Sequence, residues 1–183
     1  VKSTEDLVKH LVNQDEDGDT LLMLSIIQEY KALALNLINI VPDPSFLNMK
    51  NDLFQTALHL SVLNNDSHLV RELVIRGADL TAQDHNGNTA LHIACKKNAM
   101  ASIVALTTVI TPMDRKKCSY RVSQQIPQRQ DIYNYKGQTC LHVALEHGHL
   151  NLVRFLLESL FHADINAPER RSGRTIFHVA AES

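Results

Sequence analysis

The chain has 183 residues, with 18 Lys and Arg against 20 Asp and Glu, so its formal net charge is −2. A charge this close to zero excludes the general basic field that direct binding to nucleic acid uses. Hydrophobic residues make up 44% of the chain, which is enough for a buried core. The sequence has no charge-free apolar run of about 18 residues, so it predicts no membrane span. The three cysteines show no sign of disulfide pairing, which favours a reducing compartment.

Residues 1–13 are predicted to form a short helix. Ser3 and Asp6 have the spacing of a helix-capping box, and apolar residues follow on one face. We expect this helix to cover the open apolar end of the units that follow it.

One nine-residue motif recurs five times along the rest of the chain. Its copies occupy residues 17–25, 53–61, 86–94, 136–144 and 172–180, and the third reads Asn-Gly-Asn-Thr-Ala-Leu-His-Ile-Ala. The threonine falls at positions 20, 56, 89, 139 and 175, so the copies are 33 to 36 residues apart except for one interval of 50. A period of about 33 residues built on Thr-x-Leu-His-x-Ala resembles the ankyrin repeat. The resemblance implies an all-α solenoid of about 4.5 stacked helix-turn-helix units with β-hairpin fingers.

Each position of the motif has a local role. The glycine permits a left-handed turn, and the threonine hydroxyl caps the helix that follows. The histidine can bridge backbone groups of adjacent units through its two ring nitrogens. We expect no metal site, because the four motif histidines lie about one repeat apart in space; they are His59, His92, His142 and His178. Cys95 and Cys140 belong to the same motif and are predicted core residues.

The whole chain, residues 1–183, is predicted to be one array. Its units are residues 14–48, 49–81, 82–131, 132–167 and the truncated 168–183. Paired helices are expected at 20–28 and 31–40, at 57–63 and 69–76, at 90–97 and 100–109, and at 140–148 and 152–160. The last unit has one helix and no following partner to bury it, so we expect the native chain to continue.

The third unit contains an inserted loop at residues 111–130. A long loop adds little entropic cost, so an array tolerates it, and loops of this length are usually functional or disordered. The loop carries the basic trio Arg115-Lys116-Lys117. The trio is either a solvated patch or a localisation or partner signal, and its short length favours the patch.

The chain carries no recognised catalytic motif. A phosphate-binding G-x-x-x-x-G-K loop, a G-x-S-x-G elbow and an H-E-x-x-H helix are all absent from the sequence. Carboxylates cluster only at residues 15–19, where no apolar pocket would raise a pKa. We therefore predict a protein that is not an enzyme and uses no cofactor. Stacked repeats instead form a long concave surface that suits another protein.

Four segments resemble one family of such proteins. They are residues 16–20, 28–35, 46–56 and 133–142. Together with the long third unit, they are similar to the inhibitor-of-κB (IκB) family, and the extended third-unit loop is similar to that of its insect member. The resemblance covers residues 15–181, nearly the whole chain.

The resemblance implies an inhibitor that binds Rel/NF-κB transcription factors, masks the basic nuclear-localisation segment of the Rel dimer, and retains the dimer in the cytoplasm. First repeats bind the basic segment in this family, and later repeats bind the dimerisation domains. The acidic residues that match the first role are Asp15, Glu16, Asp17, Asp19 and Glu29, which would form charge-assisted hydrogen bonds with Lys and Arg. The other candidate contacts lie at hairpin tips and are Asp52, Phe54, His85, Asn86, Tyr133, Tyr135, Lys136, Arg171 and Arg174.

Three alternatives stay open. A virus-encoded mimic would carry the same repeats without regulatory tails. A nuclear member of the family would co-regulate transcription, so shuttling to the nucleus is an alternative to cytoplasmic retention. A generic scaffold would use the concave surface for an unrelated partner, although it has no need of the acidic opening turn. The family's phosphorylation motif and last repeats are not in this sequence, so signal-induced degradation is not assigned to it.

Overall fold

The structure is a computed structural model that describes residues 10–116, 132–158 and 164–181. The helices follow one another in pairs: α2 (Leu21–Ile27) with α3 (Lys31–Ile40), α4 (Ala57–Leu63) with α5 (Ser67–Ile75), α6 (Ala90–Lys96) with α7 (Met100–Thr107), and α9 (Cys140–Glu146) with α10 (Leu150–Glu158). The single helix α11 (Ile176–Ala180) comes last, and a 3-10 turn, η1 (Pro44–Asn48), follows α3. Residues 10–12 are helical as well. The predicted helix ends agree with these bounds to within two residues.

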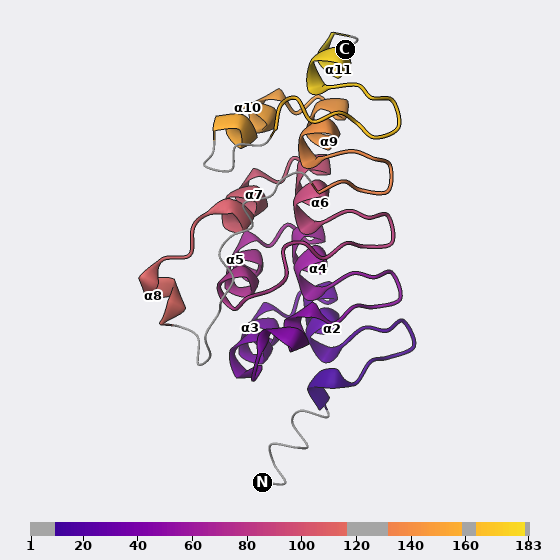
Figure 1. The fold of residues 1–183 in the computed structure, drawn as a ribbon. Helices are drawn as coiled ribbons and strands as arrows, with labels where there is room; N and C mark the ends of the chain where they lie inside the picture. The colour runs from indigo at the N-terminus through magenta and orange to yellow at the C-terminus, as the bar shows by residue number, and fades with distance from the viewer. Residues whose placement is uncertain (1–9, 117–131, 159–163, 182–183) are drawn as a thin grey trace.

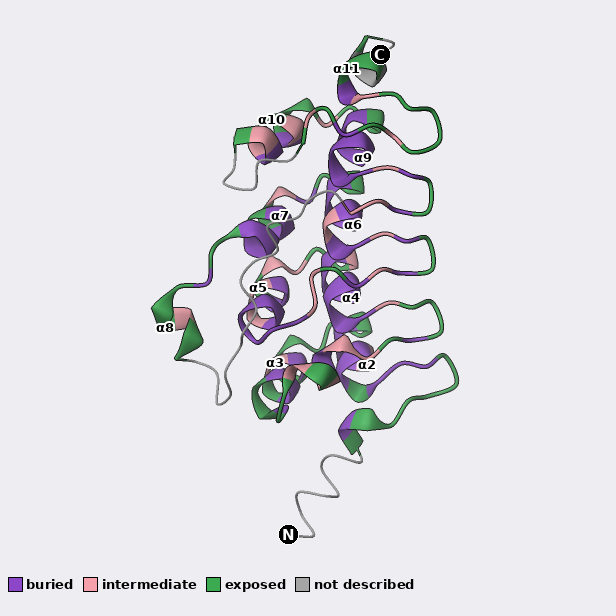
Figure 2. Cartoon of the chain, viewed as in Figure 1, coloured by how far each residue is buried: buried purple, intermediate pink, exposed green. Residues whose placement is uncertain are grey.

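The helices form two columns that run the length of the molecule (Figure 1). The inner column holds α2, α4, α6, α9 and α11, the outer column holds α3, α5, α7 and α10, and the turns before the inner helices project together to one side. Buried residues lie mainly on the helices, whereas the tips of the turns are exposed (Figure 2). Ala34, Ala94 and Ala144 are fully buried, and their small side chains let neighbouring helices approach closely. The predicted stack of helix-turn-helix units is confirmed.

Each inner helix starts directly after the motif threonine, and the turn that follows the helix lies nine residues after that threonine in four repeats. The Oγ1 atom of Thr20 accepts a hydrogen bond from the backbone N–H of Met23 at 3.3 Å, which caps α2. After each of the four inner helices that an outer helix follows, one residue in the left-handed region turns the chain back; these residues are Glu29, Asn65, Asn98 and Gly148. The reversal after α2 is closed by a bond from Tyr30 N–H to Ser25 O at 2.8 Å.

The turns that project from the inner column are the predicted hairpins, without regular β-strands in the described residues. We call them fingers one to five, and they are residues 14–20, 50–56, 83–89, 133–139 and 169–175. Within the described parts of the chain, they contain an isolated antiparallel bridge between Gln14 and Thr20 and no strand. Each finger closes on itself, as where Asp84 N–H donates to Asn88 O at 2.9 Å, and in fingers two to five one further backbone donor at the tip bonds to the neighbouring finger. Asp52 N–H donates to Asp17 O at 3.0 Å, His85 N–H to Leu53 O at 3.0 Å, and Tyr135 N–H to Asn86 O at 3.0 Å.

Two motif histidines, His59 and His92, join one repeat to the next as predicted, whereas Nε2 of His142 is buried without a hydrogen-bond partner among the described residues. The Nδ1 atom of His92 accepts from Thr89 N–H at 3.3 Å, so the ring proton lies on Nε2 and donates to Gln138 O at 3.1 Å. His59 makes the same pair of bonds, to Thr56 N–H at 3.1 Å and to Asn88 O at 3.2 Å. Both rings are buried and neutral in this arrangement. Cys95 of α6 and Cys140 of α9 are buried, as predicted, and burial raises the pKa of the Cys95 thiol.

Acid is expected to destabilise the fold through these histidines. Burial lowers the pKa of His92 to about 4, whereas histidine in an unfolded chain titrates near 6.5. As pH falls, the unfolded chain is therefore protonated before the folded chain. The neutral His92 contributes its whole stabilisation above pH 6.5, and this contribution is lost as pH drops toward 4. We expect His92 to account for a loss of about 2 kcal/mol between pH 7 and pH 5. Urea unfolding at the two pH values measures this, and a His92→Gln chain that loses as much as the native chain would contradict it.

The inserted loop starts with structure that the sequence did not predict. Residues 112–115 form a one-turn helix, α8 (Pro112–Arg115), which projects from the outer column (Figure 1). Arg71 Nη2 lies 3.0 Å from Asp114 Oδ2 and ties α8 to α5. Hydrogen bonds from Thr111 hold the pKa of Asp114 below its usual value. Residues 117–130 of the predicted loop, and residues 1–9 of the predicted N-terminal helix, lie outside the described residues.

Candidate protein-binding surface

The fingers are held rigidly by one side chain that recurs at the same place in four of them. The Oδ1 atom of Asp84 accepts from the backbone N–H groups of Asn86 and Asn88, both at 2.8 Å. Asp15, Asn51 and Asn134 accept equivalent pairs of bonds in their own fingers. These bonds fix each tip before any partner arrives, which lowers the entropy that binding must remove.

The predicted acidic cluster divides into exposed and internal carboxylates. Glu16, Asp17 and Asp52 are exposed at the tips of fingers one and two. Asp19 is only 8% exposed, and its Oδ1 accepts from Asn51 Nδ2 at 2.9 Å. Asp15 is exposed, but its Oδ1 is occupied by its own turn. The prediction that all four carboxylates of the first turn face a partner is therefore corrected, because Asp19 joins finger one to finger two.

The carboxylates of this cluster lie close enough to repel one another. Burial raises the pKa of Asp19, and the charges of Asp15, Asp17 and Asp52 raise it further, against the lowering effect of the Asn51 hydrogen bond. The cluster thus holds negative charge at some electrostatic cost in the isolated chain. A cation placed at the tips would relieve that cost.

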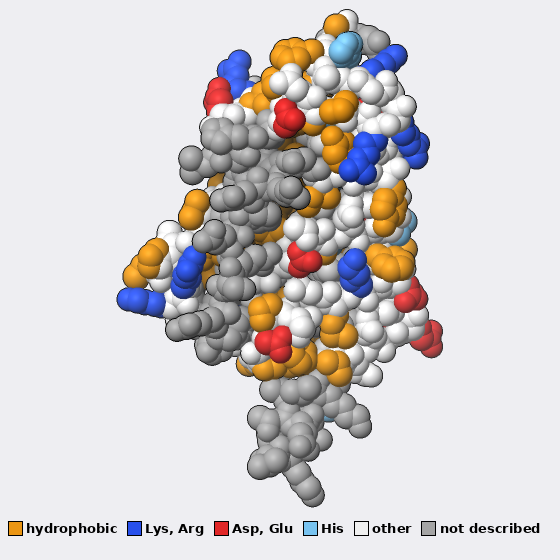
Figure 3. Space-filling model, in the orientation of Figure 1, with side chains coloured by type: hydrophobic (Ala, Val, Ile, Leu, Met, Phe, Trp, Pro, Cys, Tyr) orange, Lys and Arg blue, Asp and Glu red, His pale blue; other side chains and the backbone are white. Residues whose placement is uncertain are grey.

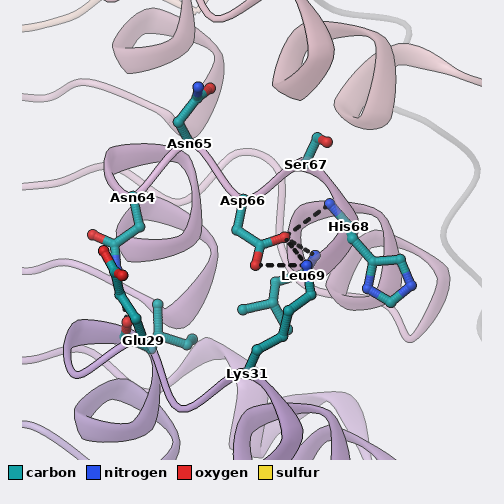
Figure 4. A pocket seen from close by; sticks show the side chains of 9 residues that line it. Glu29, Lys31, Asn64, Asn65, Asp66, Ser67, His68 and Leu69 are labelled. Atoms are coloured by element: carbon teal, nitrogen blue, oxygen red, sulfur yellow. Dashed lines mark hydrogen bonds and ion pairs between the residues drawn. The ribbon is translucent and has the colours of Figure 1, made fainter.

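Glu29 lies apart from the other predicted acidic residues. Asp19 precedes α2 and Glu29 follows it, so a helix of about 10 Å separates the two positions. Glu29 lines a groove of about 460 Å³ between the first two repeats, beside Asn64 and Asp66 (Figure 4). Lys31 Nζ lies 3.0 Å from Asp66 Oδ2 at the same place. Any contact that Glu29 makes with a partner belongs to this groove and not to the finger tips.

Apolar side chains occupy the middle of the finger row. Leu53 is 51% exposed, Phe54 57% and Tyr135 65%. Phe54 has φ 58°, in the left-handed region where fingers one, three, four and five carry glycine. A bulky residue in this conformation costs of order 1–3 kcal/mol and is uncommon away from functional sites. The Lys50 Nζ atom lies 5.8 Å from the centroid of the Phe54 ring.

We expect Phe54→Gly to separate stability from binding. Glycine adopts φ 58° without strain, so the free energy of unfolding should rise by about 0.5–1 kcal/mol in urea unfolding. Loss of the exposed ring should weaken binding of the partner about tenfold or more, because buried aromatic anchors dominate interfaces. Leu53→Ala, one residue away and with a negative φ, is the control for loss of apolar area alone. A Phe54→Gly chain that is less stable and binds unchanged would contradict the assignment.

The remaining predicted contacts occupy fingers three to five. His85 and Asn86 are exposed at the tip of finger three and bond to each other, with 2.9 Å between His85 Nε2 and Asn86 Nδ2. Lys136 is exposed on finger four, and Arg171 and Arg174 are exposed on finger five. Tyr133 lies at the base of its finger, half-buried, with the Arg170 guanidinium 4.2 Å from its ring centroid. The structure therefore brings the tip residues into one row and sets Tyr133 behind it.

Sequence reasoning missed two residues of this surface. Leu53 is exposed beside Phe54, and Asn51 is the internal partner of Asp19. A usable signal was present for both. Aligning the five motif copies on their threonine makes Leu53 the one apolar residue in a column of Asp17, Asn86, Lys136 and Ser172. The same alignment puts Asn51 in the column of Asp15, Asp84 and Asn134.

Within residues 10–116, 132–158 and 164–181, no group of three or more His, Cys, Asp or Glu side chains is placed to hold a metal ion. In the same residues, no helix has the length and apolar character needed to cross a bilayer. Both findings concern only these parts of the chain.

These features define an ankyrin-repeat protein: helix pairs stacked in two columns, threonine caps, histidine bridges and a row of fixed fingers. A family model described as ankyrin repeats in three copies matches residues 1–110 and 115–183. The family model and the stacked helix pairs confirm the predicted ankyrin-repeat solenoid. Its proposed unit boundaries stay a prediction.

Three similar proteins refine the class. NF-kappa-B inhibitor alpha of Rattus norvegicus is 40% identical over 155 residues, covering 84% of this chain and 45% of that protein. NF-kappa-B inhibitor cactus of Drosophila melanogaster is 36% identical over 182 residues, covering 92% of this chain and 36% of that protein. The crystal structure of the ankyrin repeat domain of Bcl-3, described as a unique member of the IkappaB protein family, shares 32% identity. It matches with a TM-score of 0.72 and covers 91% of this chain and 67% of that one.

The chain belongs to the IκB family of ankyrin-repeat proteins, as the four sequence segments predicted. It spans less than half the length of the two curated relatives described above.

Proposed function

We propose that the chain binds a Rel/NF-κB transcription factor dimer and covers the dimer's basic nuclear-localisation segment with fingers one and two. Covering that segment would retain the dimer in the cytoplasm. The chain acts by binding, as a regulator without catalysis. The names of the two curated relatives, both NF-kappa-B inhibitors, support this class of partner.

The observation that carries the proposal is the exposed negative charge at one end of the finger row. Glu16 and Asp17 stand at the tip of finger one, and Asp52 stands beside them on finger two. The backbone bond from Asp52 N–H to Asp17 O, at 3.0 Å, holds the two tips together. Lys and Arg side chains would form charge-assisted hydrogen bonds with these carboxylates. Asp15 and Asp19 support the surface by fixing the turn.

Apolar contacts are proposed to follow in the middle of the row. Leu53, Phe54 and Tyr135 are all more than half exposed on rigid turns. The aromatic side chains among them, Phe54 and Tyr135, supply contact area at low entropic cost. We assign His85, Asn86, Lys136, Arg171 and Arg174 to contacts with later parts of the partner, and Glu29 to a separate contact at the far end of α2.

Binding to a Rel homology dimer with and without its basic segment tests the proposal. We expect the intact dimer to bind and the shortened dimer to bind about a hundredfold more weakly at low salt, because the lost pairs lie at an exposed surface and act together. Equal binding of both dimers would contradict the masking role. No binding of either would reject the Rel partner and favour a generic scaffold.

A cellular experiment separates an inhibitor from a nuclear co-regulator. A fluorescent Rel protein expressed with this chain should move from nucleus to cytoplasm if the basic segment is covered. A Rel protein that stays nuclear while the chain accumulates beside it would support co-regulation. The Glu16→Lys, Asp17→Lys chain should leave the Rel protein nuclear in the first case.

A further inference from the structure

The charge of the finger row reverses sign along the molecule. Four residues before the repeated threonine, the five fingers carry in turn Glu16, Asp52, His85, Tyr135 and Arg171, all of them exposed. Figure 3 shows acidic side chains at one end of the finger edge and basic side chains toward the other. A partner segment that suits the first fingers is therefore repelled by the last ones.

A groove lies at the basic end of the row, between finger tips and inner helices. Its volume is about 450 Å³, within the range of about 300–1,000 Å³ that ligand sites occupy. His92 and Ile93 of α6 and Val143 of α9 line its floor. We call it the basic groove, because Lys96, Lys136 and Arg171 line it from three successive repeats.

The three cations of the basic groove have no carboxylate partner within ion-pair distance among the residues that the structure describes. Arg171 Nη2 donates to Tyr135 O at 3.1 Å, which directs this guanidinium toward finger four. Arg170 differs, since it stacks on the Tyr133 ring outside the groove. Glu146 lines the groove as well, but its Oε2 accepts from Gln138 Nε2 at 3.0 Å. The groove thus presents three cations against one engaged carboxylate.

We propose that the basic groove binds an acidic segment of a protein partner through Asp or Glu side chains. Unpaired cations in a concave site concentrate anionic groups, and arginine and lysine bind carboxylates by charge-assisted hydrogen bonds. Fixed tips add specificity, because the Oδ1 atom of Asn134 accepts from Lys136 N–H at 3.0 Å and holds finger four. The inference goes beyond the covering of a basic segment and does not rest on it. It concerns the basic end of the row, where residues assigned above to later parts of the partner lie, and not the acidic tips of fingers one and two.

An anisotropy titration with a labelled peptide of eight glutamates tests the inference on the 183-residue chain. We expect the glutamate peptide to bind at least about tenfold more tightly than a peptide of eight glutamines. Lys136→Glu with Arg171→Glu should weaken binding of the glutamate peptide by about thirtyfold. The same titration at high salt should show the loss disappear as the charges are screened.

A charge-matched variant is the control. Arg115→Glu with Lys116→Glu removes the same two positive charges from exposed positions at α8, on the outer column. This control should change binding less than about threefold, since its charges lie outside the groove. Equal losses in the two double variants, or equal binding of the two peptides, would overturn the proposal. If the groove variant unfolds, Lys136→Gln with Arg171→Gln gives the same comparison.

Discussion

Reversing the charge of finger one, with Glu16→Lys and Asp17→Lys together, is expected to weaken binding to a Rel dimer by about a hundredfold at low salt. Each reversal removes one attraction and adds one repulsion, at about 1–1.5 kcal/mol per residue for exposed charges. Neither side chain makes a hydrogen bond that the structure describes, so the free energy of unfolding should not fall. Isothermal titration gives the affinity, and urea unfolding checks the fold.

The control for this pair is Glu158→Lys with Asp164→Lys. Both residues are exposed near the opposite end of the array. The control therefore changes the net charge by the same amount but at a site far from finger one. We expect less than about threefold loss of affinity for the control. A loss as large as that of finger one would mean that net charge alone, and not the acidic tips, determines binding.

Gly87→Ala is expected to destabilise the fold by about 3–4 kcal/mol. Gly87 has φ 74°, and a Cβ atom there would lie 2.6 Å from the backbone nitrogen of Tyr135. Since that nitrogen donates to Asn86 O in finger three, the two fingers would have to move apart. Urea unfolding measures the loss.

Gly173→Ala separates backbone strain from the clash. Its φ of 68° is similar, but a Cβ atom there meets nothing within 4 Å. We expect a loss of about 1–2 kcal/mol from the left-handed conformation alone. Equal losses for the two variants would show that contact between fingers three and four adds nothing to stability.

The helices and their junctions could be predicted because the motif repeats the same local chemistry. Threonine caps, glycine turns and histidine bridges act within a few residues or between adjacent copies, so spacing alone reveals them. The four motif histidines were predicted to bridge repeats, and His59 and His92 do so.

The acidic cluster could be predicted only in part. The sequence of an acidic run does not show which of its side chains face water and which face a neighbouring turn. The burial of Asp19 depends on Asn51, which lies 32 residues away. The separation of Glu29 from the cluster, in contrast, follows from the length of α2 and was available from the sequence. The fingers were predicted as hairpins, and each closes on its own backbone, but the bonds from one finger tip to the next have no local sequence signal.

The most direct test of the central claim is a double-mutant cycle between finger one and the basic segment of the Rel dimer. Removing the basic segment should cost the native chain about a hundredfold in affinity. The same removal should cost the Glu16→Lys, Asp17→Lys chain less than about threefold, because the pairs are already lost. Equal losses for the two chains would place the basic segment elsewhere and contradict the role assigned to the acidic fingers.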